Sequence, residues 1–152
     1  MLAAVLLSGI AVVAGCAPEP EPTPTTAAPV PTQTATPTAA PEPTLVPDGT
    51  ATDNLPLFRG VVEQVWASDR RAEGRAYVDA LVGAGFDKAA MQVTEDQSTV
   101  GNPAESILVS VRWGEECLIG QVGPETGEPV AAVERVVGEG MCLIGNTRPI
   151  DW

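Results

Sequence analysis

Aromatic and basic side chains are confined to the last two thirds of the chain, which limits where a core can form. All three Trp, both Phe, the only Tyr and all eight Lys and Arg follow residue 54, whereas residues 17–54 hold ten of the fifteen Pro. Segments rich in Pro and small polar residues cannot bury enough apolar surface to fold. Only residues 55–152 are therefore expected to form a packed domain, one so small that a covalent cross-link would add useful stability.

An apolar stretch that ends in a cysteine opens the chain. Residues 1–15 contain no charged residue and are mostly Ala, Val, Leu, Ile and Gly. This length suits the apolar core of a signal peptide and is short for a membrane span, which needs about 20 residues. The stretch ends in Val13-Ala14-Gly15-Cys16, which resembles the lipobox of bacterial lipoproteins. The resemblance implies cleavage after Gly15, leaving residues 1–15 as a lipoprotein signal peptide, and thioether-linked diacylglycerol on Cys16.

Lipidation of Cys16 would decide where the chain resides. Two acyl chains, such as palmitate, anchor a protein stably, whereas one chain binds only marginally at about 0.8 kcal/mol per buried CH₂. We therefore expect the rest of the chain to be tethered at the extracytoplasmic face of the cell membrane. The alternative is a free Cys16 after an uncleaved anchor. No Lys or Arg precedes the apolar run, although signal peptides usually begin with one, and we expect a start codon upstream of Met1.

Residues 16–54 are predicted to be the lipidated Cys16 followed by a disordered tether rich in Pro and Thr. The stretch shows no apolar periodicity of 2 or 3.6 residues. Pro-rich linkers extend by about 3.1 Å per residue, so this one could reach on the order of 100 Å. We expect a spacer that is dispensable for folding; the alternative is a Pro-rich ligand for a partner domain. The composition also permits O-glycosylation.

Two amphipathic helices are predicted at the start of residues 55–152. The first, over residues 55–67, has apolar side chains at helical spacing. These are Leu57, Phe58, Val61, Val62, Val65 and Trp66. The second covers residues 73–84, and Gly85 is suited to end it because glycine readily adopts the positive φ of a helix C-terminus.

Strand patterns follow the two helices. Alternating apolar residues predict strands over residues 91–94, 107–113 and 117–122, and a last strand over 141–145. The spacing of Val130, Val133 and Val137 predicts a short third helix, although β-branched residues would serve equally in a strand. Strands grouped after helices favour a small single α+β domain, with two N-terminal helices and then an antiparallel sheet of about four strands.

Two cysteines remain once Cys16 is lipidated, and each opens a similar segment. Cys117-Leu118-Ile119-Gly120 and Cys142-Leu143-Ile144-Gly145 share one alternation and are expected to lie close in one sheet. Because an exported domain meets an oxidising compartment, we predict a Cys117–Cys142 disulfide. In the chain-entropy model such a bond stabilises by roughly 3–3.5 kcal/mol. Two buried free thiols, or a redox pair, are the alternatives.

The composition argues against several kinds of chemistry. There is no His, which removes the usual catalytic base and the commonest metal ligand. The doublets Glu95-Asp96 and Glu115-Glu116 do not form catalytic pairs, because adjacent strand residues point to opposite faces. We expect no catalytic, cofactor-binding or metal-binding residue. A formal charge of −12 repels phosphate backbones, so nucleic acid is not expected as a partner.

Several short segments together resemble one family. They are residues 87–94, residues 110–114, the two Cys-Leu-Ile-Gly segments and residues 147–152. The family comprises uncharacterised lipoproteins of high-GC Gram-positive bacteria (actinobacteria) and is classed as a domain of unknown function. The resemblance covers residues 54–152 and implies a location, but it implies no activity, ligand or catalytic residue.

The leading hypothesis is a lipid-anchored, non-catalytic module that binds an envelope protein or a small ligand. A small carboxylate-dependent hydrolase or transferase and a structural assembly subunit are the alternatives. For binding, the polar tail after the last strand is the first candidate, because loops at strand ends commonly carry function. Its residues are Asn146, Thr147, Arg148 and Asp151. The alternative for the tail is that Arg148 pairs with Asp151 while Trp152 closes the core.

Overall fold

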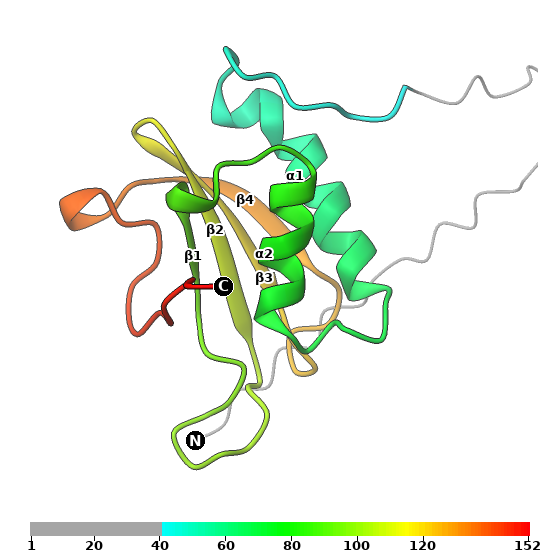
Figure 1. Ribbon diagram of the computed structural model, residues 1–152, viewed down its shortest axis with the longest axis vertical. Helices are drawn as coiled ribbons and strands as arrows, with labels where there is room; N and C mark the ends of the chain where they lie inside the picture. The colour runs from blue at the N-terminus through cyan, green and yellow to red at the C-terminus, as the bar shows by residue number, and fades with distance from the viewer. Residues whose placement is uncertain (1–40) are drawn as a thin grey trace, which may run out of the picture. The chain divides into compact units, whose positions relative to one another are not determined.

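The computed structural model describes residues 41–152, in which two helices cover one face of a four-stranded antiparallel sheet (Figure 1). The helices are α1 (Ala51–Trp66) and α2 (Gly74–Gly83). The strands are β1 (Met91–Val93), β2 (Ile107–Trp113), β3 (Glu116–Val122) and β4 (Val130–Arg135), and they pair in chain order. The predicted α+β class is confirmed. The predicted signal peptide, Cys16 and the tether up to residue 40 lie outside the described residues.

Helix α1 begins four residues before its predicted start. Thr50 caps it, because its side chain accepts from the Asp53 N–H while the Asp53 carboxylate accepts from the Thr50 N–H. Asn54, fully buried, holds the preceding segment by bonding both the N–H and the carbonyl of Val46. Leu45 packs against the core. The predicted boundary at residue 54 is therefore too late, and residues 45–54 belong to the fold rather than to a dispensable tether.

Helix α2 ends as its sequence predicts. Gly85 has φ +99°, and its N–H donates to the carbonyl of Val82 while the N–H of Phe86 donates to that of Leu81. This is the Schellman arrangement, which satisfies carbonyls that a helix end would otherwise leave unpaired. The turn places Phe86 against α1, where its ring packs edge-to-face against that of Phe58, with 6.1 Å between the ring centroids.

The first face of the sheet, the one toward the helices, holds the main core. Helix α1 lies over β3 and β4, and α2 lies over β1 and β2 (Figure 1). Side chains alternate along each strand, so Val109 and Val111 face the helices and are buried. At Gly120 a Cβ would stand 3.3 Å from the Phe58 ring, so the missing side chain allows α1 to approach β3 closely.

After β3 the structure departs from two predictions. Residues 130–135 form strand β4 and not a third helix, because Val133 pairs with Leu118 and the β-branched residues complete the sheet. Residues 141–145 form no strand. They follow the 3₁₀ turn η2 (Gly138–Gly140), and only Met141 makes an isolated bridge, to Val137. The prediction that both cysteine segments lie in one sheet is therefore wrong, although the Cys117–Cys142 disulfide does bring them close together.

Within residues 41–152, no helix combines the length and the apolar character that crossing a membrane requires.

Candidate functional site

The polar tail, predicted as a binding loop, is fastened to the fold by Arg148. The backbone N–H of Arg148 donates to the carbonyl of Val93 at 2.9 Å, and its Nη1 lies 2.7 Å from Oδ2 of Asp96. The other Asp96 oxygen accepts the N–H of Gly74 at the start of α2. Arg148 therefore pairs with Asp96 and not with Asp151, which is exposed. The alternative prediction for the tail, a pair between Arg148 and Asp151, was therefore wrong.

Trp152 lies on α2 among basic side chains. Its ring is 5.2 Å from Arg75, 5.4 Å from Lys88 and 4.9 Å from Arg148, distances typical of cation–π contacts. Its Nε1 donates to Oδ1 of Asp79 at 2.9 Å. Burial acts to raise the pKa of Asp79, but the hydrogen bonds from Trp152 and Arg75 outweigh it and the pKa is lowered. The expected packing of Trp152 against the core is confirmed.

The remaining tail residues are not drawn together into one site. Asn146 lines a wide depression with the loop before β2, and Thr147 is half-buried. Asp151 is exposed. A binding role for Asn146, Thr147, Arg148 and Asp151 stays a prediction, with Arg148 serving the fold.

Most basic side chains of this acidic domain already have a partner. Six of the eight contact a carboxylate, an aromatic ring or a backbone carbonyl. They are Arg59, Arg70, Arg71, Arg75, Lys88 and Arg148. Within residues 41–152, Arg112 on β2 and Arg135 on β4 make no such contact. Both line a cavity, but that of Arg135 also contains the carboxylates of Glu115 and Glu116, whereas that of Arg112 contains only Asp87.

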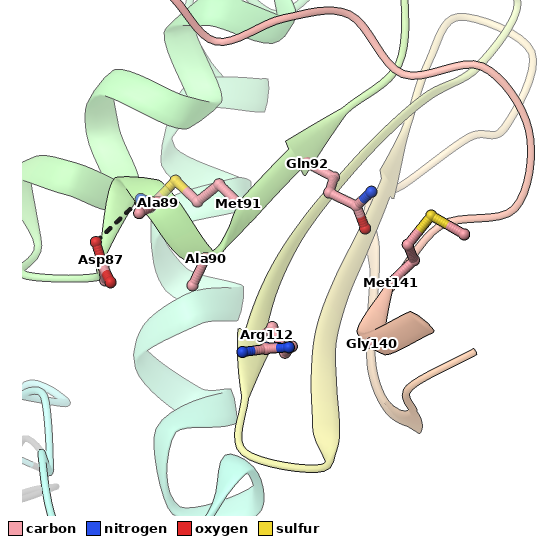
Figure 2. A pocket seen from close by; sticks show the side chains of 8 residues that line it. All are labelled: Asp87, Ala89, Ala90, Met91, Gln92, Arg112, Gly140 and Met141. Carbon is pink, nitrogen blue, oxygen red and sulfur yellow. Dashed lines mark hydrogen bonds between the residues drawn. The ribbon is translucent and has the colours of Figure 1, made fainter. Parts of the chain in front are cut away.

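This cavity, the Arg112 pocket, has a volume of about 420 Å³ and is open to solvent (Figure 2). One wall is the 3₁₀ turn η1 (Lys88–Ala90), the floor is the second face of β1 and β2, and the opposite wall is the end of η2. Its lining residues are Asp87, Ala89, Ala90, Met91, Gln92, Arg112, Gly140 and Met141. Figure 2 shows Arg112 rising from β2 between Ala90 and Gly140.

A covalent bond and one amide side chain fix the η2 wall. Cys117 and Cys142 form the predicted disulfide, with 5.6 Å between their Cα atoms. Cys117 is also the cross-strand partner of Arg112, so the bond joins the wall to the floor beside the guanidinium. Oε1 of Gln92 accepts the N–H groups of Cys142 at 2.7 Å and Leu143 at 3.2 Å. The wall is therefore held by specific contacts rather than by regular secondary structure.

Gly140 allows this wall to approach the guanidinium. Its φ is +75°, and a Cβ there would stand 2.6 Å from Nη1 of Arg112. Any larger residue would push the guanidinium aside and would strain the backbone. Glycine at this position therefore leaves room for the guanidinium beside the wall.

Ser110 lies on the same face, two residues before Arg112 and opposite Gln92 in the register. Its side chain is fully buried, and its Oγ has no hydrogen-bond partner in the described part of the chain. Buried hydroxyls are almost always paired, so an unpaired one calls for a structural or functional reason.

A second, smaller pocket of about 280 Å³ lies between the C-terminal end of α1 and the loops beside β2 and β3. Trp66, Ile107 and Pro124 give it a mainly apolar lining, and Arg71 stands over the Trp66 ring at 5.5 Å. The nearby hydroxyl of Tyr77 donates to the carbonyl of Arg71 at 2.7 Å, and burial raises the pKa of Tyr77 to about 12. Tyr77 is therefore a neutral structural residue at physiological pH.

The sequence did not predict the Arg112 pocket. Alternation along β2 places Ser110 and Arg112 on the face opposite the apolar residues, and this is the only signal that the sequence holds. The wall that makes a pocket comes from irregular backbone around residue 140, just before the stretch 141–145 that was predicted as a strand.

Comparison with protein families gives one match. The model of a family described as a domain of unknown function (DUF6993) matches residues 62–146, which include Arg112, Gln92 and both disulfide cysteines. No curated protein and no solved structure was found to match the chain. The match spans more than half of the sequence, and the chain therefore belongs to the DUF6993 family.

Proposed function

We propose that this chain is a lipoprotein of high-GC Gram-positive bacteria, anchored by acyl chains on Cys16 to the extracytoplasmic face of the cell membrane. The observation that carries this proposal is the sequence Val13-Ala14-Gly15-Cys16 at the end of an uncharged apolar run. The change to a Pro-rich composition directly after Cys16 supports it, as does a disulfide, because disulfides persist in exported proteins.

The anchored domain, we further propose, is a non-catalytic binding module for an envelope protein or a small ligand. The Arg112 pocket supports this role, since binding sites are usually largely preformed and its wall is held covalently. Its single carboxylate belongs to Asp87, whose Oδ1 already accepts the N–H of Ala89 as a cap of η1. A residue bound in this way is poorly suited to general acid–base work.

Lipidation is tested by expressing the full chain in a bacterium that processes lipoproteins. Intact mass should show a mature protein that begins with an acylated Cys16 and sediments with membranes. Cys16→Ser should abolish both results, whereas Ala17→Ser, one position further on, should leave both unchanged. A mature wild-type protein without an acyl group would overturn the proposed anchor.

Catalysis is tested on the same purified chain in mild detergent. Ester, phosphate and glycan substrates should show no turnover above the buffer rate. Turnover that is lost in Asp87→Asn, which keeps a capping oxygen but removes the charge, would show that the pocket is catalytic and would contradict the binding role.

A further inference from the structure

We propose that the Arg112 pocket binds the carboxylate group of a small monoanionic ligand, with the Arg112 guanidinium as its main partner. This inference rests on the proposed binding function and names the class of ligand. A guanidinium presents five N–H donors in a planar fork that matches the two oxygens of a carboxylate. In this pocket the fork has no carboxylate of the chain bound to it, because Arg112 makes no ion pair within residues 41–152.

Other unsatisfied groups around Arg112 are also hydrogen-bond donors. Gln92 uses its Oε1 to hold the N–H groups of Cys142 and Leu143, so the Nε2 of this lining residue is left as a donor. Ser110, which is fully buried, lies opposite Gln92 in the register and two residues before Arg112 on the same face, and its hydroxyl is unpaired within the described residues. Arg112 and Gln92 therefore offer free N–H donors to an anion, while the one carboxylate of the lining, that of Asp87, lies on the η1 wall.

The surrounding charge selects a singly charged ligand over a multiply charged one. Residues 41–152 carry eighteen acidic and eight basic side chains, and Asp87 stands on the pocket wall opposite Gly140. A negative domain repels a dianionic phosphate more strongly than a carboxylate, which a single guanidinium can neutralise. Met141 and Ala90 add apolar surface for the rest of the ligand.

The geometry also explains why the disulfide lies where it does. It joins Cys142, in the wall after Gly140 and Met141, to Cys117, the cross-strand partner of Arg112. The bond therefore holds the wall against the strand that pairs with β2 at Arg112. A preformed site of this kind binds without the entropic cost of ordering the segment.

The test is an NMR titration of the full ¹⁵N-labelled chain in detergent micelles with N-acetyl-L-leucine. The neutral amide N-acetyl-L-leucinamide is the matched probe, because it differs only in lacking the carboxylate. The acid should shift the Arg112 Nε–H resonance and the backbone amides of Gln92 and Met141, and the amide should not. N-acetyl-L-leucine should also bind at least tenfold more tightly than phenyl phosphate.

Three arginine variants locate the interaction. Arg112→Gln should weaken binding of the acid at least tenfold, and Arg112→Lys should restore part of the affinity because a lysine keeps the charge without the fork. Arg135→Gln, which removes the other unpaired arginine, should change nothing, and neither should Arg71→Gln in the second pocket. Because Arg112 is exposed, its variants should keep the wild-type thermal midpoint, which is measured alongside.

Equal binding of acid and amide, binding that depends on Arg71 or Arg135, or no shifts at 20 mM acid would each overturn the carboxylate site. These results would leave the lipid anchor standing, because acylation of Cys16 is measured separately. They would also leave a binding role open to the tail residues, which a shift confined to Asn146, Thr147 and Asp151 would identify.

Discussion

The two faces of the sheet are covered in different ways. The first face is packed against α1 and α2 through a continuous apolar cluster that includes Phe58, Tyr77 and Leu118. The second face is only partly covered, by the irregular segment around Cys142 and Leu143, and its small cluster contains the disulfide. The first face therefore depends on nonspecific apolar burial, and the second depends on a few directed contacts.

This difference separates stability from recognition. Apolar burial stabilises in proportion to the area removed from water and leaves no polar group available to a ligand. Directed contacts leave gaps, and the Arg112 pocket is such a gap on the second face. Changes on the first face should therefore cost mainly stability, whereas changes on the second should affect the pocket as well.

The largest loss is expected from Phe58→Ala on the first face. The ring is fully buried between Gly120 and Phe86, so its removal leaves a cavity and should lower the free energy of unfolding by about 3–5 kcal/mol. Denaturant unfolding measures this. Ile144→Ala, on the second-face segment and 84 % exposed, is the control and should change stability by less than about 0.5 kcal/mol. Similar losses in both variants would remove the distinction between the faces.

An intermediate loss is expected when the disulfide is removed. The double variant Cys117→Ala with Cys142→Ala should lower the free energy of unfolding by about 2–4 kcal/mol, because the bond closes a loop of 25 residues. Hydrogen exchange should also accelerate at the backbone N–H groups of positions 142 and 143, which Gln92 holds, but not at Val62 in α1. If hydrogen exchange accelerated equally at positions 142–143 and at Val62, the segment around residue 142 would not cover the second face independently of the helices.

The first face was largely predictable from the sequence, because its side chains repeat with the period of their element. The pattern of apolar residues in β2 predicted Ile107–Trp113 with correct bounds. Val130 and Val133 are three residues apart, a spacing that also fits a helix, and only their pairing with β3 settles that they form a strand. The expectation of export, with two cysteines left if Cys16 is lipidated, was enough to predict the Cys117–Cys142 bond.

The second face was not predictable in the same way. Its cover lacks a period, since the backbone turns at Glu139 and Gly140 through positive φ. Its contacts join residues about 50 positions apart, such as Gln92 with Cys142. No local sequence pattern predicts that Arg112 lies beside Gly140. The start of α1 was missed for a related reason, because its signal lies in one cap, Thr50, within a stretch of Pro and Thr.

The smallest effect, and the one that most sharply separates the two faces, is expected from Ser110→Ala. On the first face every truncation removes favourable packing, but at Ser110 the removed atom is a buried hydroxyl that has no partner in the described part of the chain. Losing an unpaired buried hydroxyl removes a desolvation cost, so the variant should be neutral or more stable by up to about 1 kcal/mol.

The same change should weaken binding of N-acetyl-L-leucine if the Ser110 hydroxyl helps to hold the ligand beside Arg112. Val109→Ala, the neighbouring position facing the helices, is the matched comparison, and it should destabilise by about 1–3 kcal/mol while leaving the affinity for the acid unchanged. A destabilised Ser110→Ala with unchanged affinity would show that the hydroxyl serves the fold, and the second face would then be a structural surface like the first.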